Sequence, residues 1–289
     1  MKPLLTRKPK RFFAFGCSFT NYCFPTWADI IALELKVPYW NYGQSGAGNQ
    51  YIFNMLMQAD CLYQFNKDDL VIVEWTNIAR EDRYLMAKQK WVSPGNIYSA
   101  SPSRDEYEFI NDTYIEKWAD PFYYALRDFA IIKAAIDFFD NKKVQYHQLK
   151  MIDLEMFDHF QPNKSLENVS KELLKLYNPY LSHIEKSFYD VLWNNDLRIK
   201  YDMQSSEIGP FFKDGHPSVM EHLKYLQTVF DCEFSKDTIE QSKLAHSTII
   251  DILKTLKVDS NTSKWSSVLK FPQEIRIAQE FSQDKKGFY

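Results

Sequence analysis

The sequence predicts an α/β protein in which a parallel sheet carries helices on both of its faces. Two observations support this prediction. Short apolar runs that suit buried strands alternate with segments of helical spacing in the first part of the chain. A polar or glycine-rich loop follows each of these runs. Such an order of strands and helices is typical of a parallel sheet, because parallel neighbours need a long crossover connection.

Each element of this first part has its own signal. Residues 12–15 are a short apolar run and 68–75 (DDLVIVEW) is an unbroken β-branched core, so both predict buried strands. Residues 37–42 predict another short strand between them in the chain. Apolar positions recur with helical spacing in 25–36, and 51–65 follows a glycine-rich stretch, so these two segments predict helices.

The middle of the chain is less regular. Residues 79–118 mix charges, prolines and tyrosines without clear periodicity, which predicts an insertion over the active edge of the sheet. A helix at 121–140 and a strand at 144–152 follow. Further helices are predicted at 166–177, 181–192 and 237–257. Pro179 lies between the first two of these, and we expect it to end or kink the helix there.

The later part of the chain suggests one main domain and an appendage. Ser218 and Glu221 form an S-x-x-E capping box, which predicts that another helix begins at this point. We expect an α/β domain over residues 1–232 and a C-terminal helical extension with a tail over 233–289.

The composition excludes several classes of protein. A net charge of −3 gives no basic field, so nucleic acid is not expected as a partner. No apolar run approaches a membrane span, and the N-terminal segment lacks the apolar stretch of a signal peptide. The four cysteines lack metal-ligand spacing and favour free thiols in a reducing compartment. We expect a cytoplasmic protein with no membrane partner, and the sequence leaves its oligomeric state open.

Ser18 and His216 are the candidate pair for acyl-transfer chemistry. Ser18 follows the first predicted strand, at the edge of the sheet where α/β proteins bind ligands. A serine hydroxyl is a weak nucleophile until a neighbouring imidazole takes its proton. Asp214 is a candidate to hold this imidazole in one tautomer, because residues i and i+2 of an extended segment face the same side. A backbone carbonyl is the alternative partner for the ring.

The oxyanion formed in such a reaction needs hydrogen-bond donors that are already in place. The candidates are the backbone N–H groups of Ser18 and Gly46 and the side-chain amide of Asn77. Trp75 and Arg80 lie close to Asn77 in the chain and are candidates for substrate contact. For Arg80, the alternative is an ion pair with the acidic residues that follow it.

Two further groups of residues are weighed as sites. Cys17 stands next to the candidate nucleophile, but strand alternation directs it away from Ser18, so we expect a small buried residue. An acidic cluster with one histidine has no second histidine at ligand spacing, so no metal is expected, and no cofactor. The members of this cluster are Asp153, Glu155, Asp158 and His159.

Four short motifs occur in a fixed order along the chain. They are GCSFT at 16–20, QSGAGNQ at 44–50, EWTN at 74–77 and DGHP at 214–217. This order resembles that of the SGNH/GDSL hydrolases, a large esterase and lipase family. The resemblance covers residues 11–80 and 205–230. The sequence reads GCS where the family commonly has GDS, and Asp214 is one residue closer to the histidine than in the family's DxxH.

The resemblance implies a fold and a set of roles. The fold is a three-layer α/β/α sandwich of the flavodoxin-like type, on a mostly parallel sheet of about five strands. By resemblance, Ser18 is the nucleophile, His216 the general base, and Gly46 and Asn77 donors to the oxyanion.

The sequence therefore favours a serine-dependent ester hydrolase that works through an acyl-enzyme. The expected substrate is a small acyl ester, such as an acetyl group on a carbohydrate. Two alternatives stay open. One is a non-catalytic protein that keeps the fold for binding or structure, with 79–118 and 231–289 as its interaction surfaces. The other is an acyltransferase that passes the same acyl group to a second substrate.

Overall fold

The computed structural model describes residues 3–98, 109–154, 167–193, 216–255 and 275–287. Within these ranges the central sheet has the order β2-β1-β3-β6, and every neighbouring pair is parallel. The strands are β1 (Arg11–Phe15), β2 (Tyr39–Asn41), β3 (Asp69–Trp75) and β6 (Gln145–Lys150). The predicted α/β class with a parallel sheet is confirmed. The described residues supply four strands of the sheet, where about five were expected.

The path of the chain across this sheet determines where a ligand would bind. From β1 the chain moves to β2 on one side, and it then returns to β3 on the other side of β1. Phe15 at the end of β1 lies beside Val73 in β3. In open α/β sheets, ligands bind outside the carboxyl ends of the strands at such a switch point. The loops that leave β1 and β3 here carry Ser18 and Asn77.

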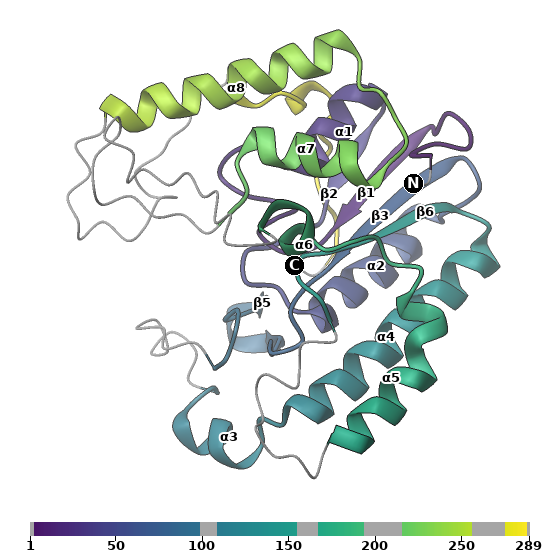
Figure 1. Ribbon diagram of the computed structural model, residues 1–289, viewed down its shortest axis with the longest axis vertical. Helices are drawn as coiled ribbons and strands as arrows, with labels where there is room; N and C mark the ends of the chain where they lie inside the picture. The colour runs from purple at the N-terminus through teal and green to yellow at the C-terminus, as the bar shows by residue number, and fades with distance from the viewer. Residues whose placement is uncertain (1–2, 99–108, 155–166, 194–215, 256–274, 288–289) are drawn as a thin grey trace.

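Helices cover both faces of the sheet, as predicted (Figure 1). One face carries α1 (Trp27–Leu35), α7 (Val219–Val229) and α8 (Lys236–Thr255), which pack on one another. The other face carries α2 (Asn49–Tyr63), α4 (Pro121–Lys142) and α5 (Glu167–Leu181). This arrangement is a three-layer α/β/α sandwich, consistent with the flavodoxin-like fold that the resemblance implies.

Side chains at the helix ends explain where these helices begin. The capping box predicted at α7 is present, because the Ser218 hydroxyl accepts from the Glu221 N–H and the Glu221 carboxylate accepts from the Ser218 N–H. Asp120 caps α4, and Pro121 occupies its first turn, where a missing N–H costs nothing.

Pro179 does not break the helix where the sequence predicted. α5 continues through Pro179 and ends at Leu181, and α6 (Phe188–Trp193) is shorter than the helix predicted at 181–192. Pro179 lies in the last turn of α5, where its missing N–H removes one hydrogen bond close to the helix end. The Ser182 N–H still bonds to the Asn178 carbonyl, at 2.9 Å.

The region predicted as an irregular insertion contains regular structure. It forms an antiparallel hairpin of β4 (Arg83–Leu85) and β5 (Lys90–Val92), with a 3-10 turn η1 (Met86–Lys88) between them, and the helix α3 (Asp112–Lys117). Strands of three residues are too short to show a period in the sequence. For this reason the hairpin was missed.

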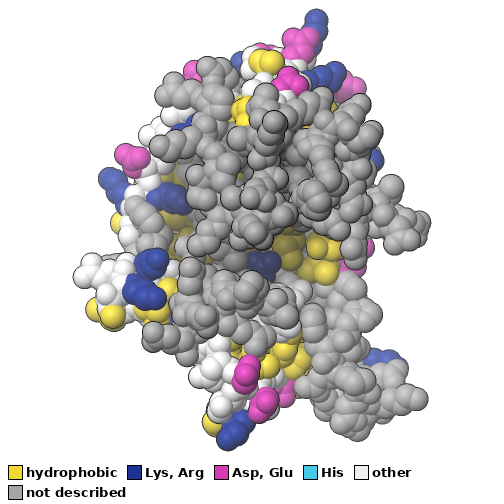
Figure 2. Space-filling model, turned by 90° about the vertical axis from the view of Figure 1, so that its left-hand side faces the viewer, with side chains coloured by type: hydrophobic (Ala, Val, Ile, Leu, Met, Phe, Trp, Pro, Cys, Tyr) yellow, Lys and Arg dark blue, Asp and Glu magenta, His cyan; other side chains and the backbone are white. Residues whose placement is uncertain are grey.

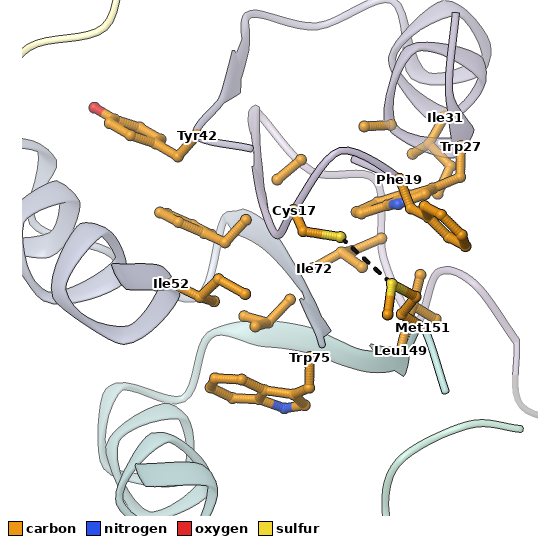
Figure 3. Packing of buried hydrophobic residues seen from close by; sticks show 14 of the residues in the cluster. Cys17, Phe19, Trp27, Ile31, Tyr42, Ile52, Ile72, Trp75, Leu149 and Met151 are labelled. Carbon is orange, nitrogen blue, oxygen red and sulfur yellow. Dashed lines mark hydrogen bonds between the residues drawn. The ribbon is translucent and has the colours of Figure 1, made fainter. Parts of the chain in front are cut away.

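Aromatic residues fill much of the core beside β1. Phe13 stacks on Trp40 with ring centroids 4.7 Å apart, and Phe15 stacks on Tyr42 at 5.2 Å. The parallel register of β1 and β2 places such rings beside one another. Figure 3 shows the core near the carboxyl ends of the strands, where Cys17 and Met151 face each other.

The described C-terminal segment returns to the sheet. Tyr39 in β2 forms a parallel bridge with Ser282, and the Gln283 N–H donates to the Tyr39 carbonyl at 2.8 Å. The segment therefore covers part of an edge strand, which is the position in a sheet most open to association. The domain boundary near residue 232 stays a prediction. None of the helices in the described ranges has the length and apolar character needed to cross a bilayer.

Candidate active site

Ser18 lies in a tight turn directly after β1. The N–H groups of Thr20 and Asn21 both donate to the Cys17 carbonyl, at 3.0 and 3.1 Å, and so close the turn. Gly16 begins the turn, and a Cβ on this residue would lie 2.0 Å from Thr20 Oγ1. The turn therefore requires glycine at position 16. Ser18 itself is 7% exposed. We call residues 16–21 the serine turn.

The ring of His216 lies at the serine turn, although the two are far apart in the chain. Its ring stacks on Tyr22, with centroids 3.8 Å apart and planes 20° apart. It also meets the ring of Phe19, the residue after Ser18, at 5.6 Å. His216 lies two residues before Ser218, the N-cap of α7, so this helix carries it to the carboxyl edge of the sheet. Asp214, the predicted partner of the imidazole, lies outside the described residues.

A second histidine lies close by and was missed by sequence reasoning. His222 is in α7, is 1% exposed, and has a ring near those of Phe19 and Phe188. Burial, and in second place the proximity of His216, lower the pKa of His222 to about 3. An imidazole with so low a pKa is a poor proton acceptor at neutral pH. His216 therefore remains the candidate base.

Gly46 has a left-handed backbone conformation and no room for a side chain. Its φ is +79°, and a Cβ would lie 2.3 Å from the carbonyl oxygen of Ser93. Ser93 follows the β4–β5 hairpin, so this insertion packs directly against the glycine-rich loop. The N–H of Ala47 donates to the Gln44 carbonyl at 3.0 Å and closes a turn around Gly46. No other residue type fits here without strain.

Asn77 is half-buried in the loop after β3, and its side chain has a fixed orientation. Its Oδ1 accepts from the Ala79 N–H at 2.6 Å. The amide oxygen is therefore engaged by the backbone, and the amide NH₂ is the end that can donate to a substrate oxygen.

Asn49, at the start of α2, also holds this loop in place. Its Oδ1 accepts from the Thr76 N–H at 2.8 Å, and its Nδ2 donates to the Thr76 carbonyl at 3.1 Å. The side chain thus pairs with the backbone of Thr76 as a neighbouring strand would. Its Nδ2 also donates to Asp128 of α4 at 2.7 Å. Sequence reasoning did not single out Asn49, although it lies in the glycine-rich motif.

The two residues predicted to contact substrate, Trp75 and Arg80, are both buried and both bond to other parts of the protein. Trp75 is fully buried, its indole N–H donates to Gln148 Oε1 at 2.8 Å, and its ring points away from Cys17 and Met151 (Figure 3). Arg80 is 8% exposed, and its guanidinium donates to the Ala47 carbonyl at 2.7 Å. Trp75 is thus a core residue. Arg80 bonds to the glycine-rich loop. Its side chain does not form the ion pair with Glu81 or Asp82 that was the alternative considered for it.

Cys17 has the buried environment that was expected. It is fully buried, and burial raises the pKa of its thiol to about 11. A thiol of this kind is unreactive, because the thiolate is the nucleophilic form. Among the described residues no group of three or more His, Cys, Asp or Glu could hold a metal ion. Of the acidic cluster considered from the sequence, only Asp153 is within the described ranges, where it pairs with Lys150.

Figure 2 views the molecule from the side toward which the carboxyl ends of the strands point in Figure 1. Hydrophobic side chains of the described residues gather near the centre of this face.

No family model matches the sequence, and no curated protein does. Several solved structures resemble this chain, among them the three described next. One is a G-D-S-L family protein from Desulfitobacterium hafniense DCB-2, at 14% identity and a TM-score of 0.37 over 75% of this chain and 99% of that one. A member of the lipolytic protein G-D-S-L family from Veillonella parvula DSM 2008 has 15% identity and a TM-score of 0.35, over 75% and 96%.

The third likeness is to Axe2, an acetylxylan esterase from Geobacillus stearothermophilus. It has 14% identity and a TM-score of 0.37, over 78% of this chain and 95% of that one. The α/β assignment of the present chain rests on its own strand order and strand directions.

Proposed function

We propose that the protein is a serine-dependent ester hydrolase that works through an acyl-enzyme. The observation that carries this proposal is the packing of the His216 ring on Phe19 and Tyr22, which both follow Ser18 closely in the chain. This packing supports the proposal, because it brings the ring of the candidate base to the turn that carries Ser18, at the switch point of the α/β sheet, where ligands bind.

The reaction would proceed in two halves. Ser18 Oγ attacks the ester carbonyl carbon while His216 takes the hydroxyl proton, and a tetrahedral oxyanion forms. The C–O bond to the alcohol then breaks, and His216 returns the proton to the leaving alkoxide. In the second half, water gives a proton to His216 and attacks the acyl-enzyme. Ser18 leaves with its proton restored, and the carboxylic acid is released.

The oxyanion would be held by donors on three different loops. These are the N–H groups of Ser18 and Gly46 and the amide NH₂ of Asn77. The fixed turn at Gly46 and the bond that orients Asn77 support these roles. Donors that are already positioned need not reorganise during the reaction, which is why each is worth about a hundredfold or more in rate.

The imidazole of His216 needs a fixed orientation to transfer protons in both halves of the reaction. The stacking of Tyr22 at 3.8 Å restrains the plane of the ring. We propose Asp214 or a backbone carbonyl as the acceptor that selects the tautomer.

The substrate we propose is a small acyl ester, such as an acetyl group on a carbohydrate. Ser18 is 7% exposed, and a hydroxyl this deeply set favours a small acyl group over a long chain.

An active-site phosphonate tests this proposal. We expect a fluorophosphonate to label the wild-type protein at Ser18, and we expect the protein to hydrolyse p-nitrophenyl acetate. Ser18→Ala should abolish both signals, and Ser182→Ala, at an exposed serine, should leave both unchanged. A folded wild-type protein that is neither labelled nor active would support the non-catalytic alternative. Acetyl transfer to an added alcohol, in place of hydrolysis, would indicate an acyltransferase.

A further inference from the structure

A buried carboxyl group beneath the serine turn has no part in the mechanism above. Glu74 is the next-to-last residue of β3 and is completely buried. Thr20 Oγ1 donates to its Oε2 at 2.6 Å, and the Cys17 thiol lies 3.5 Å from its Oε1. Both partners belong to the serine turn, on either side of Ser18. Glu74 therefore contacts the turn at two points, and Asn41 of β2 adds a third link by donating to the Thr20 carbonyl at 2.8 Å.

The backbone of the turn approaches this carboxyl closely at Gly16. A Cβ on Gly16 would lie 2.7 Å from Glu74 Oε2. Since Gly16 leads directly into Cys17 and Ser18, a shift of the carboxyl would have to be transmitted to the serine. Protein interiors are packed densely enough to transmit such displacements.

The hydrogen-bond donors around Glu74 suit an ionised carboxylate. An ionised carboxylate only accepts, and both the Thr20 hydroxyl and the Cys17 thiol are placed to donate to it. The other titratable groups near it are Arg80, in the loop after β3, and Tyr225, in α7. Burial raises the pKa of Glu74 to about 7, while the Thr20 hydrogen bond and the charge of Arg80 act in the opposite direction.

We propose that Glu74 is a positioning residue, which holds the serine turn through Thr20 and Cys17 so that Ser18 presents its hydroxyl and N–H to the substrate. This inference rests on the proposed function. Glu74 belongs to the motif at 74–77, but the order of motifs gives it no role. Under this proposal, activity depends on a side chain that does not touch the substrate.

The direct test uses Glu74→Gln, which keeps the size of the side chain and removes its charge. We expect kcat for p-nitrophenyl acetate to fall about tenfold to a hundredfold, because small misplacements of a nucleophile cost rate on this scale. KM should change less than twofold. We expect the wild type to lose activity below pH 7 as Glu74 takes up a proton, so log kcat should fall less steeply with acidification in Glu74→Gln.

A second pair of variants covers the case in which Glu74→Gln does not fold. Thr20→Val keeps the shape of the side chain but removes the donor, and Thr20→Ser keeps the donor. We expect Thr20→Val to lose kcat at least tenfold and Thr20→Ser to stay within threefold of the wild type. The rate of fluorophosphonate labelling at Ser18 should follow the same order.

The outcomes separate this inference from the proposed function. If the wild type is neither labelled nor active, the proposed function fails, and the inference fails with it. If the wild type is labelled and active, but Thr20→Val and any folded Glu74→Gln match its kcat and its pH profile, the inference alone is overturned.

Discussion

At the scale of single residues, the candidate site depends on glycines that have no room for a side chain. Gly46 has a φ of +79°, and its missing Cβ would collide with the Ser93 carbonyl. Gly95 offers a matched comparison, because its φ is +81° but nothing lies within 4 Å of a Cβ built there. A side chain would cause the same backbone strain at both positions, but only at Gly46 would its Cβ also collide with a neighbouring atom.

We expect Gly95→Ala to lower the free energy of unfolding by about 1 kcal/mol, which is the cost of a left-handed backbone for a residue with a Cβ. Gly46→Ala should lower the free energy of unfolding by about 2 kcal/mol more than Gly95→Ala, because the Ser93 backbone must also move. Urea unfolding measures both values. Equal losses in the two variants would show that the contact between Gly46 and Ser93 is not as close as described.

Single residues also show where sequence reasoning succeeded and where it failed. The turns that carry Ser18 and Gly46 were predicted from the sequence, because a glycine after a strand has a local conformational cause, and the roles of the two residues stay predictions. Trp75 was assigned to substrate contact but lies in the core. Strand alternation predicts that neighbouring residues face opposite sides of a sheet, but it does not predict which side meets the substrate. Glu74 and His222 were missed, since burial of a polar residue depends on which elements pack over it.

At the scale of elements, a buried polar network joins α2, α4 and the loop after β3. Arg127 of α4 donates to Asp128 at 2.7 Å and to the Arg80 carbonyl at 2.9 Å. Asp128 in turn accepts from Asn49, whose side chain pairs with Thr76. The network therefore fixes the loop that carries Asn77, a candidate donor to the oxyanion.

This network predicts a large difference between two cations of the same helix. Arg127→Met should lower the free energy of unfolding by about 3 kcal/mol, because it leaves the fully buried Asp128 without its ion-pair partner. Lys133→Met should change it by less than about 0.5 kcal/mol, since Lys133 and its partner Asp137 are both exposed. Chemical denaturation of the two variants tests this, and similar losses would contradict the role given to the network.

The elements differ in how well the sequence predicted them. The strand at 69–75 and the cap of α7 were predicted well, because an unbroken β-branched run and a capping box are strong local signals. The β4–β5 hairpin was missed, since three-residue strands show no period. The position of Pro179 within its helix could not be judged, because the sequence alone does not show whether a proline lies in the interior or the last turn.

At the scale of the whole molecule, the parallel sheet is what brings distant residues together. The strand order β2-β1-β3-β6 puts the loops after β1 and β3 side by side, and α7 returns His216 to the same edge. The alternation of strands and helices was sufficient to predict the parallel sheet, and that its carboxyl edge is the site stays a prediction. It was not sufficient to predict the polar contacts beneath the edge, which join segments far apart in the chain.

The account depends most on the approach of His216 to Ser18, and a crystal structure of the protein would measure it directly. We expect a ring nitrogen of His216 within about 3.5 Å of Ser18 Oγ, or brought there by rotation of the two side chains alone. A His216 ring on the other side of the serine turn, beyond the reach of any rotamer, would contradict the proposed function.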